Sequence, residues 1–281
     1  MSMQTEVVIR PRRSWLRFNF SELVQYRDLL LILVRRDFVS KYKQTVLGPA
    51  WFVIQPLLTT MVFTVVFGNV AKVPTDGVPP MLFYLCGLLG WNYFAQTLNA
   101  TGNTFTNNSH IFGKVYFPRL VVPLSLVVSN LFAFGIQLFV FLLFYAHYRW
   151  NVGTPLVFDS TIGLLPIVVV HSAVLALGAG LWISALTAKY KDFSHLLGFL
   201  TQLWMFATPV IYPLSQIPDK WRWLAVANPM APVVELYKRM FIGAGTVEPA
   251  HYALSWAVTL LLALTGMLYF QRVERTVVDT V

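Results

Sequence analysis

Residues 47–70 read LGPAWFVIQPLLTTMVFTVVFGNV, a run without a single Asp, Glu, Lys or Arg. A helix needs about 20 consecutive apolar residues to cross the hydrocarbon core of a bilayer, so this run is long enough to span it. Its apolar residues are continuous rather than alternating, which favours a helix over a strand of a membrane barrel. The stretch therefore predicts a membrane-spanning helix.

Charge-free runs of this kind recur along the chain of 281 residues and predict an all-α membrane protein. Only 12% of residues are charged and 57% are hydrophobic, whereas soluble domains are about 25% charged, which excludes an ordinary soluble enzyme. The six predicted transmembrane helices are 47–70, 81–101, 120–147, 161–187, 196–212 and 251–270, the fifth being the shortest. We therefore expect a cytoplasmic tail with an amphipathic interface helix over 1–46, a transmembrane domain over 47–271, and a cytoplasmic tail over 272–281.

The net charge of +9 is distributed unevenly between the two sides of the membrane. Six spans place both termini on one side, and that side carries 15 of the 21 Lys and Arg residues. Because the positive-inside rule assigns the side rich in Lys and Arg to the cytoplasm, we expect both termini there. The basic balance is therefore mainly a signal of orientation rather than of nucleic-acid binding.

Three segments outside the spans have patterns of their own. Residues 22–45 mix apolar and basic side chains, which is typical of an amphipathic helix on the membrane surface, or of a basic flank that only orients the first span. Residues 110–119 carry an apolar ridge that we expect to dock into a partner or back onto the bundle. Residues 213–250 hold apolar pieces too short to cross, and they predict short re-entrant or interfacial helices on the outer face.

Within the spans the polar and small residues favour packing over chemistry. A stripe of small residues every four positions indicates a close helix–helix contact. Its members are Ser172, Ala176, Gly180, Ser184 and Ala188. The only deeply placed histidine, His171, is most simply a hydrogen-bonded interior residue, and the single cysteine, Cys86, a small buried one.

Catalytic motifs are missing from the sequence. There is no G-x-x-x-x-G-K-[ST] loop for ATP and no histidine pair at metal-binding spacing. No charged residue lies inside the six spans, although ion-coupled carriers and intramembrane enzymes normally need one there. The energy source is therefore expected outside the membrane and outside this chain. Aromatic, hydroxyl and amide side chains remain, and these suit either sugar rings or ordinary helix packing.

Four stretches together resemble the permease subunit of type-2 ABC exporters, which move cell-surface polysaccharides such as O-antigen, capsule and teichoic acid. They are YKQTVLGPAW at 42–51, QPL at 55–57, GKVYFPRL at 113–120 and KYKD at 189–192. The resemblance covers about 30–275. It implies a homodimer in the bacterial inner membrane, partnered by two copies of a separate ATPase. ATP and Mg²⁺ would bind to that partner, while this chain would hold no cofactor, no metal and no catalytic residue.

The resemblance also implies roles for individual residues. Contacts with the ATPase would fall on the N-terminal helix and the first cytoplasmic loop, at Arg35, Arg36, Asp37, His110, Phe112, Lys114 and Tyr116. The turn at Leu47 and Gly48 would gate the cytoplasmic entrance. The first and fifth spans would line the channel with Phe52, Gln55, Thr59, Phe63, Gln202, Phe206 and Tyr212. An undecaprenyl pyrophosphate would meet Arg36, Lys41 and Lys43.

Two other functions stay open at this point. A type-2 exporter permease for a small drug or lipid would have the same sequence features. A membrane-embedded transferase or channel acting alone would need buried carboxylates or a metal constellation, and the spans contain neither. The chain also lacks the appended globular domain of larger exporters, so a module that recognises the glycan would lie on the ATPase or be absent.

Overall fold

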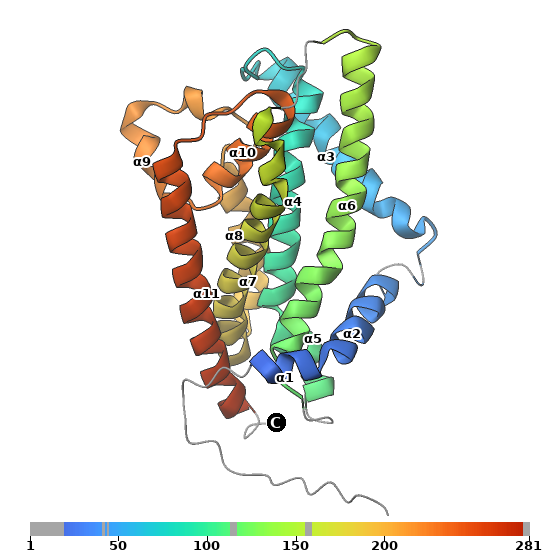
Figure 1. Cartoon of the computed structure of the whole chain (residues 1–281), viewed down its shortest axis with the longest axis vertical. Helices are drawn as coiled ribbons and strands as arrows, with labels where there is room; N and C mark the ends of the chain where they lie inside the picture. The colour runs from blue at the N-terminus through green and yellow to red at the C-terminus, as the bar shows by residue number, and fades with distance from the viewer. Residues whose placement is uncertain (1–19, 41–42, 44, 113–116, 155–158, 278–281) are drawn as a thin grey trace, which may run out of the picture.

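The computed structural model describes residues 20–40, 43, 45–112, 117–154 and 159–277 (Figure 1). Within these ranges the regular elements are all helical, which confirms the predicted fold class. The N-terminal half holds α1 (Phe20–Gln25), α2 (Arg27–Ser40), η1 (Gly48–Ala50), α3 (Trp51–Phe63), η2 (Thr64–Val70), α4 (Pro80–Gly102), α5 (Thr104–Phe112) and α6 (Val121–Trp150). The C-terminal half holds η3 (Ser160–Leu164), α7 (Leu165–Lys189), α8 (Asp192–Phe206), η4 (Leu214–Gln216), α9 (Asp219–Ala227), α10 (Ala231–Ile242) and α11 (Pro249–Val277).

Four of the six predicted spans are confirmed by length and composition. The helical stretches Gly48–Val70, Val121–Trp150, Ser160–Lys189 and Pro249–Glu274 are each long and apolar enough to cross a membrane. The other two predicted spans fall on α4 and α8. Helix α4 has 23 residues but carries several amide side chains, and α8 has only 15 residues. At about 1.5 Å per residue, α8 is shorter than the roughly 30 Å hydrocarbon core.

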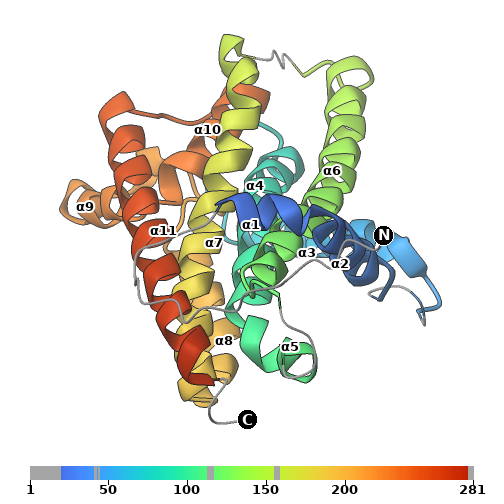
Figure 2. The same ribbon diagram turned by 60° about the horizontal axis from the view of Figure 1, so that its bottom comes forward.

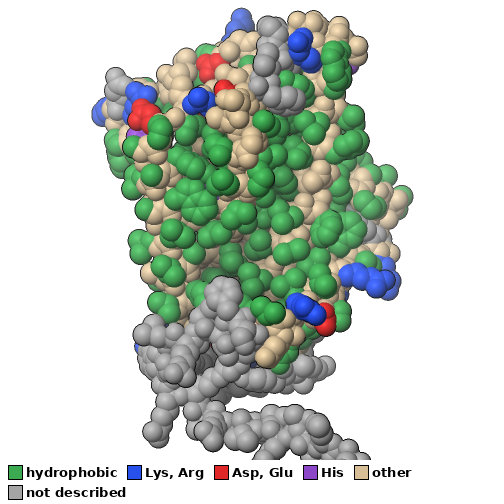
Figure 3. Space-filling view, in the orientation of Figure 1, with side chains coloured by type: hydrophobic (Ala, Val, Ile, Leu, Met, Phe, Trp, Pro, Cys, Tyr) green, Lys and Arg blue, Asp and Glu red, His purple; other side chains and the backbone are tan. Residues whose placement is uncertain are grey.

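The long helices run between two ends of an elongated bundle (Figures 1 and 2). Helices α1, α2 and α5 and the end of α11 gather at the lower end of Figure 1, whereas α9 lies near the upper end. Charged side chains collect at these two ends, and hydrophobic side chains cover the middle of the face shown in Figure 3. This distribution is that of a protein whose middle zone contacts lipid.

Helix α7 packs closely on α4 and on α11, as the stripe of small residues predicts. A Cβ atom at Gly180 would collide with Thr101 of α4, and one at Gly266 of α11 would collide with the backbone carbonyl of Gly178. The hydroxyl of Thr187 donates a hydrogen bond to the carbonyl of Gly102 at 2.9 Å. These contacts bring the backbones of the three helices together and make α7 the centre of the bundle.

Helix α4 uses its polar side chains to hold its neighbours. The Asn99 amide donates to Thr201 Oγ1 of α8 at 3.3 Å, and Ser194 of α8 donates to Asn103 Oδ1 at 2.6 Å. On another side, the Asn130 amide of α6 donates to Thr97 Oγ1 at 3.3 Å. These polar side chains therefore pack against other helices, which explains why α4 is not among the four long apolar stretches.

The predicted re-entrant region forms two helices with different surroundings. Helix α9 presents Trp221 and Trp223 outward, 50% and 62% exposed, as expected of a helix at a membrane interface. Helix α10 is buried along nearly its whole length and ends at Gly243, whose φ of +66° places it in the left-handed region. Helix α9 is thus the interfacial helix, and α10 is embedded in the bundle.

Substituting Gly266 with Ala tests the close contact between α7 and α11. The new methyl group would press on a backbone carbonyl that cannot rotate away, so we expect a loss of about 1–3 kcal/mol of stability. Thermal unfolding of the purified protein in detergent measures this loss. The matched control is Gly135→Ala on α6, where a Cβ meets nothing within 4 Å. Equal unfolding midpoints for the two variants would contradict the proposed packing.

Candidate functional site

The N-terminal helix and the first loop, predicted to meet an ATPase, are joined to each other. Arg36 Nη2 of α2 donates to Asp37 Oδ1 at 2.8 Å and to Asn108 Oδ1 of α5 at 3.3 Å. The Asn108 amide in turn donates to the carbonyl of Thr104 at 3.1 Å. Asp37 and Asn108 are buried and Arg36 is half-buried, so this polar contact links α2 to α5 at the edge of the protein interior.

Aromatic side chains extend the same contact toward α11. The rings of Phe105 and Phe270 stack with centroids 4.7 Å apart, and Phe112 lies 5.8 Å from Phe105 and 5.9 Å from Phe117. Phe117 packs with Leu33 of α2 in a second small core. The predicted apolar ridge over 110–119 thus docks back onto the bundle where it is described, and Phe112 faces inward.

Arg119 connects this layer to the end of the last helix. Its guanidinium donates to the backbone carbonyl of Glu274 at 3.1 Å, and its backbone N–H donates to Glu274 Oε1 at 3.3 Å. The guanidinium also lies 5.2 Å from the centre of the Phe112 ring, within the range of a cation–π contact. Arg119 is buried, and it therefore joins the first loop, α6 and α11 at one point.

The remaining residues predicted at this end differ in exposure. Arg35 and Lys43 are exposed, whereas Arg36 is engaged with Asp37 and Asn108. Leu47 and Gly48 form the predicted turn, with Gly48 at a φ of +52° and Leu47 exposed. The side chain of His110, and Lys41, Lys114 and Tyr116, lie outside the described residues.

The predicted channel-lining residues divide into outward-facing and inward-facing sets. Gln55 of α3 and Gln202 of α8 are exposed, and Phe206 is 45% exposed. Phe63 instead makes edge contacts with Phe67 and Tyr84, and the Tyr212 hydroxyl donates to the carbonyl of Phe206 at 3.0 Å. Thr59 is half-buried, and its hydroxyl donates to the carbonyl of Gln55 at 3.0 Å.

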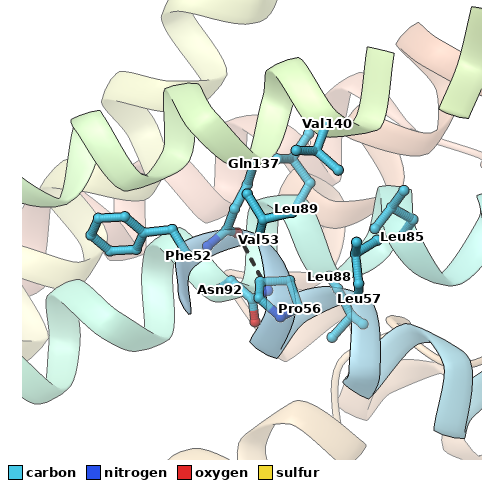
Figure 4. A pocket seen from close by; sticks show the side chains of 10 residues that line it. All are labelled: Phe52, Val53, Pro56, Leu57, Leu85, Leu88, Leu89, Asn92, Gln137 and Val140. Atoms are coloured by element: carbon cyan, nitrogen blue, oxygen red, sulfur yellow. Dashed lines mark hydrogen bonds between the residues drawn. The ribbon is translucent and has the colours of Figure 1, made fainter. Parts of the chain in front are cut away.

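Phe52 lines a cavity between α3, α4 and α6 (Figure 4). Pro56 and aliphatic side chains form most of its wall, and one polar contact crosses it, from the Asn92 amide to Gln137 Oε1 at 3.4 Å. The cavity is largely apolar, so in a membrane it suits hydrocarbon better than a sugar.

Helix α10 buries two charged residues that lie outside the six predicted spans. The side chains of Glu235 and Lys238 are 1% and 0% exposed, and Lys238 Nζ lies 3.2 Å from Glu235 Oε1. The sequence placed both residues on the outer face, because α10 is too short to count as a span. Their spacing of three residues in an apolar helix was the only signal that could have pointed to a buried ion pair.

His171 is an interior hydrogen-bonded residue, as predicted. Its Nε2 lies 2.9 Å from Thr259 Oγ1 and 3.2 Å from Ser255 Oγ, both on α11. The imidazole stacks on Trp256 with centroids 4.1 Å apart. The histidine therefore contributes to the α7–α11 interface, and Cys86 is likewise buried in the core.

Several apolar helices long enough to span a bilayer, with basic and acidic groups at the two ends, define a multi-pass membrane protein. The chain belongs to the ABC-2 type transporter family, whose model matches residues 28–242. It is therefore the membrane-embedded transport subunit, which confirms the resemblance found in the sequence and the expectation that the chain is not an enzyme.

The similar proteins are bacterial export permeases. The O-antigen export system permease protein RfbA of Myxococcus xanthus is 31% identical over 258 residues, which cover 90% of this chain and 96% of that protein. RfbA of Klebsiella pneumoniae is 26% identical over 88% of this chain and 92% of its own length. The polysialic acid transport protein KpsM of Escherichia coli is 24% identical over 86% of this chain and 92% of its own.

Substituting Arg119 with Met tests whether this residue fastens the end of α11. The variant keeps the length of the side chain and removes its hydrogen bond to Glu274. We expect the amides of residues 270–274 to exchange about tenfold faster, because local opening then costs less. The control is Arg27→Met. Arg27 is an exposed arginine whose Nε lies 3.7 Å from Oδ1 of the adjacent residue, Asp28. Unchanged protection in the Arg119 variant would refute the fastening role.

Proposed function

We propose that this chain is the channel-forming subunit of an ATP-driven exporter that moves a lipid-linked cell-surface polysaccharide across the cytoplasmic membrane. The names of the similar permeases support this substrate class. The main support for a channel is that Gln55 and Gln202 are exposed on helices whose other exposed side chains are mostly apolar. An amide facing lipid is costly, so these side chains are better placed against a polar path or a second protein surface.

A homodimer accounts for the position of these two residues. Helix α3 contacts α4 and α6, and α8 contacts α4 and α7, so the two predicted channel helices lie on different flanks of α4. A second copy would cover these faces and close a path between the subunits, with α4 and α8 completing the six spans. Phe206 and Tyr212 would then offer aromatic surface near the outer end of the path, where sugar rings could slide.

The end that carries α1, α2 and α5 would face the cytoplasm and bind two copies of an ATPase, which hold ATP and Mg²⁺. Arg35 and Lys43 are exposed there, where an anionic pyrophosphate headgroup and a partner protein would both arrive. Because Arg36, Asn108 and Arg119 join α2, α5 and α11, a movement imposed on this end would reach the spans directly.

Complementation of a strain that lacks this chain tests the function and the docking end together. Wild-type protein should restore surface polysaccharide and co-purify with its ATPase partner. Arg35→Glu should weaken that co-purification at least about tenfold and lower export, because the reversed charge would oppose a partner surface that is complementary to the arginine. The matched control is Arg149→Glu, an exposed arginine in the last turn of α6, at the opposite end of that helix from the α5 side.

Two results would contradict the proposal. Normal surface polysaccharide in the deletion strain, accompanied by hypersensitivity to small drugs, would favour a drug exporter. Loss of ATPase binding in the Arg149 variant but not in the Arg35 variant would place the ATPase at the end opposite α1, α2 and α5.

A further inference from the structure

The segment that follows α8 is buried without being helical. Thr208, Pro209, Val210 and Ile211 are buried, and the backbone there forms turns rather than a continued helix. Non-helical backbone at membrane depth leaves carbonyl groups that no helix can satisfy, so other protein groups must bind them.

Side chains from the following region bind these carbonyl groups. Lys238 Nζ of α10 donates to the carbonyl of Pro209 at 2.5 Å and to that of Tyr212 at 3.2 Å. The Asn228 amide, just before α10, donates to the carbonyl of Ala207 at 3.1 Å, and Trp204 Nε1 of α8 donates to Asn228 Oδ1 at 2.9 Å. The end of α8 is thus tied at three carbonyls to the α9–α10 region.

The lysine is itself fully enclosed. Glu235 Oε1 lies 3.2 Å from Nζ, and Nζ lies 4.1 Å from the centre of the Phe83 ring on α4. The second oxygen of Glu235 accepts the backbone N–H of Thr246 at 3.1 Å, beyond the end of α10. One ion pair therefore fixes α4, the end of α8, α10 and the turn after α10 relative to one another.

Stability alone does not explain this ion pair. Moving two charges out of water costs several kcal/mol each, and well-packed apolar residues in the same place are often equally stable or better. A buried cation does, however, bind several carbonyls at once, which no apolar side chain can do. Its specific effect is thus on geometry.

We propose that Lys238 is a positioning residue that holds the end of α8 to the α9–α10 region, so that both move as one body when the outer end of the path opens. This role rests on the proposed function, because it concerns the channel wall that carries Gln202 and Phe206. The lysine is fully buried and acts through the backbone of residues 207–213.

The deciding variant replaces both charges, Glu235→Leu with Lys238→Met. It leaves no buried charge unpaired, so the protein should fold and co-purify with the ATPase as wild type does. The amides of residues 207, 208 and 210–212 should exchange about tenfold faster, while α7 and α11 keep their protection. Polysaccharide export should fall by about the same factor.

The single variant Lys238→Met should lose protection throughout the bundle, because it leaves Glu235 buried and unpaired.

The matched control is Arg239→Met on the same helix, where a half-buried arginine lies 3.9 Å from Asp159 and away from the end of α8. It should leave both exchange over 207–212 and export unchanged. Unchanged exchange over 207–212 in the double variant would overturn the positioning role, as would an equal loosening of the whole bundle. Faster local exchange with normal export would overturn its part in transport. If wild-type protein exports no polysaccharide, the proposed function fails. The exchange result still shows whether Lys238 holds the end of α8 to the α9–α10 region.

Discussion

The absence of water from the bilayer core is the constraint on which this fold depends, because each buried polar group must then find its partner within the protein. Helix α4 meets the constraint with a set of amides and hydroxyls that bind α6, α7 and α8. Around this helix the backbones of α7 and α11 approach closely, since glycine occupies the contact points. The same constraint explains the buried lysine of α10, which binds carbonyls that the short α8 leaves without helical partners.

Exposed polar side chains mark the surfaces on which function is proposed. Gln55 and Gln202 lie on the outside of the single chain, in an otherwise apolar zone. At the end that holds α2 and α5, the interior is closed by Asn108, Arg119 and aromatic rings, while Arg35 stays exposed. The chain thus combines a rigid interior with two outward polar features, one suited to a path and one to a partner.

Much of the fold could be predicted from the sequence because hydrophobicity is a property of local composition. The continuous apolar runs predicted four spans that the structure confirms by length, and the small-residue stripe predicted the close packing of α7. The family could also be predicted, since the motifs around Gly48 and Arg119 stand at characteristic places relative to those runs. Short helices with buried faces, such as α10, were predicted only as interfacial or re-entrant pieces.

What could not be predicted depends on contacts between distant residues. Lys238 was counted with the outer charges, because nothing in its neighbourhood says that it meets carbonyls 26 and 29 positions earlier. The rings of Phe112 and Phe63 pack against neighbouring aromatics, and only the tertiary structure shows which way a side chain points. The hydrogen bonds that join α4 to α6 and α8 also connect residues far apart in the sequence, so no local pattern predicts them.

We propose that this chain provides the path by which a lipid-linked polysaccharide crosses the membrane, driven by ATP hydrolysis on its partner. Reconstitution of the purified chain with its ATPase, in liposomes that carry the lipid-linked glycan on the ATPase side, measures this transfer. We expect ATP to drive the glycan to the protected side, and the transfer to stop when either protein is omitted. Transfer without ATP, or ATP hydrolysis that never moves the glycan, would contradict this proposal.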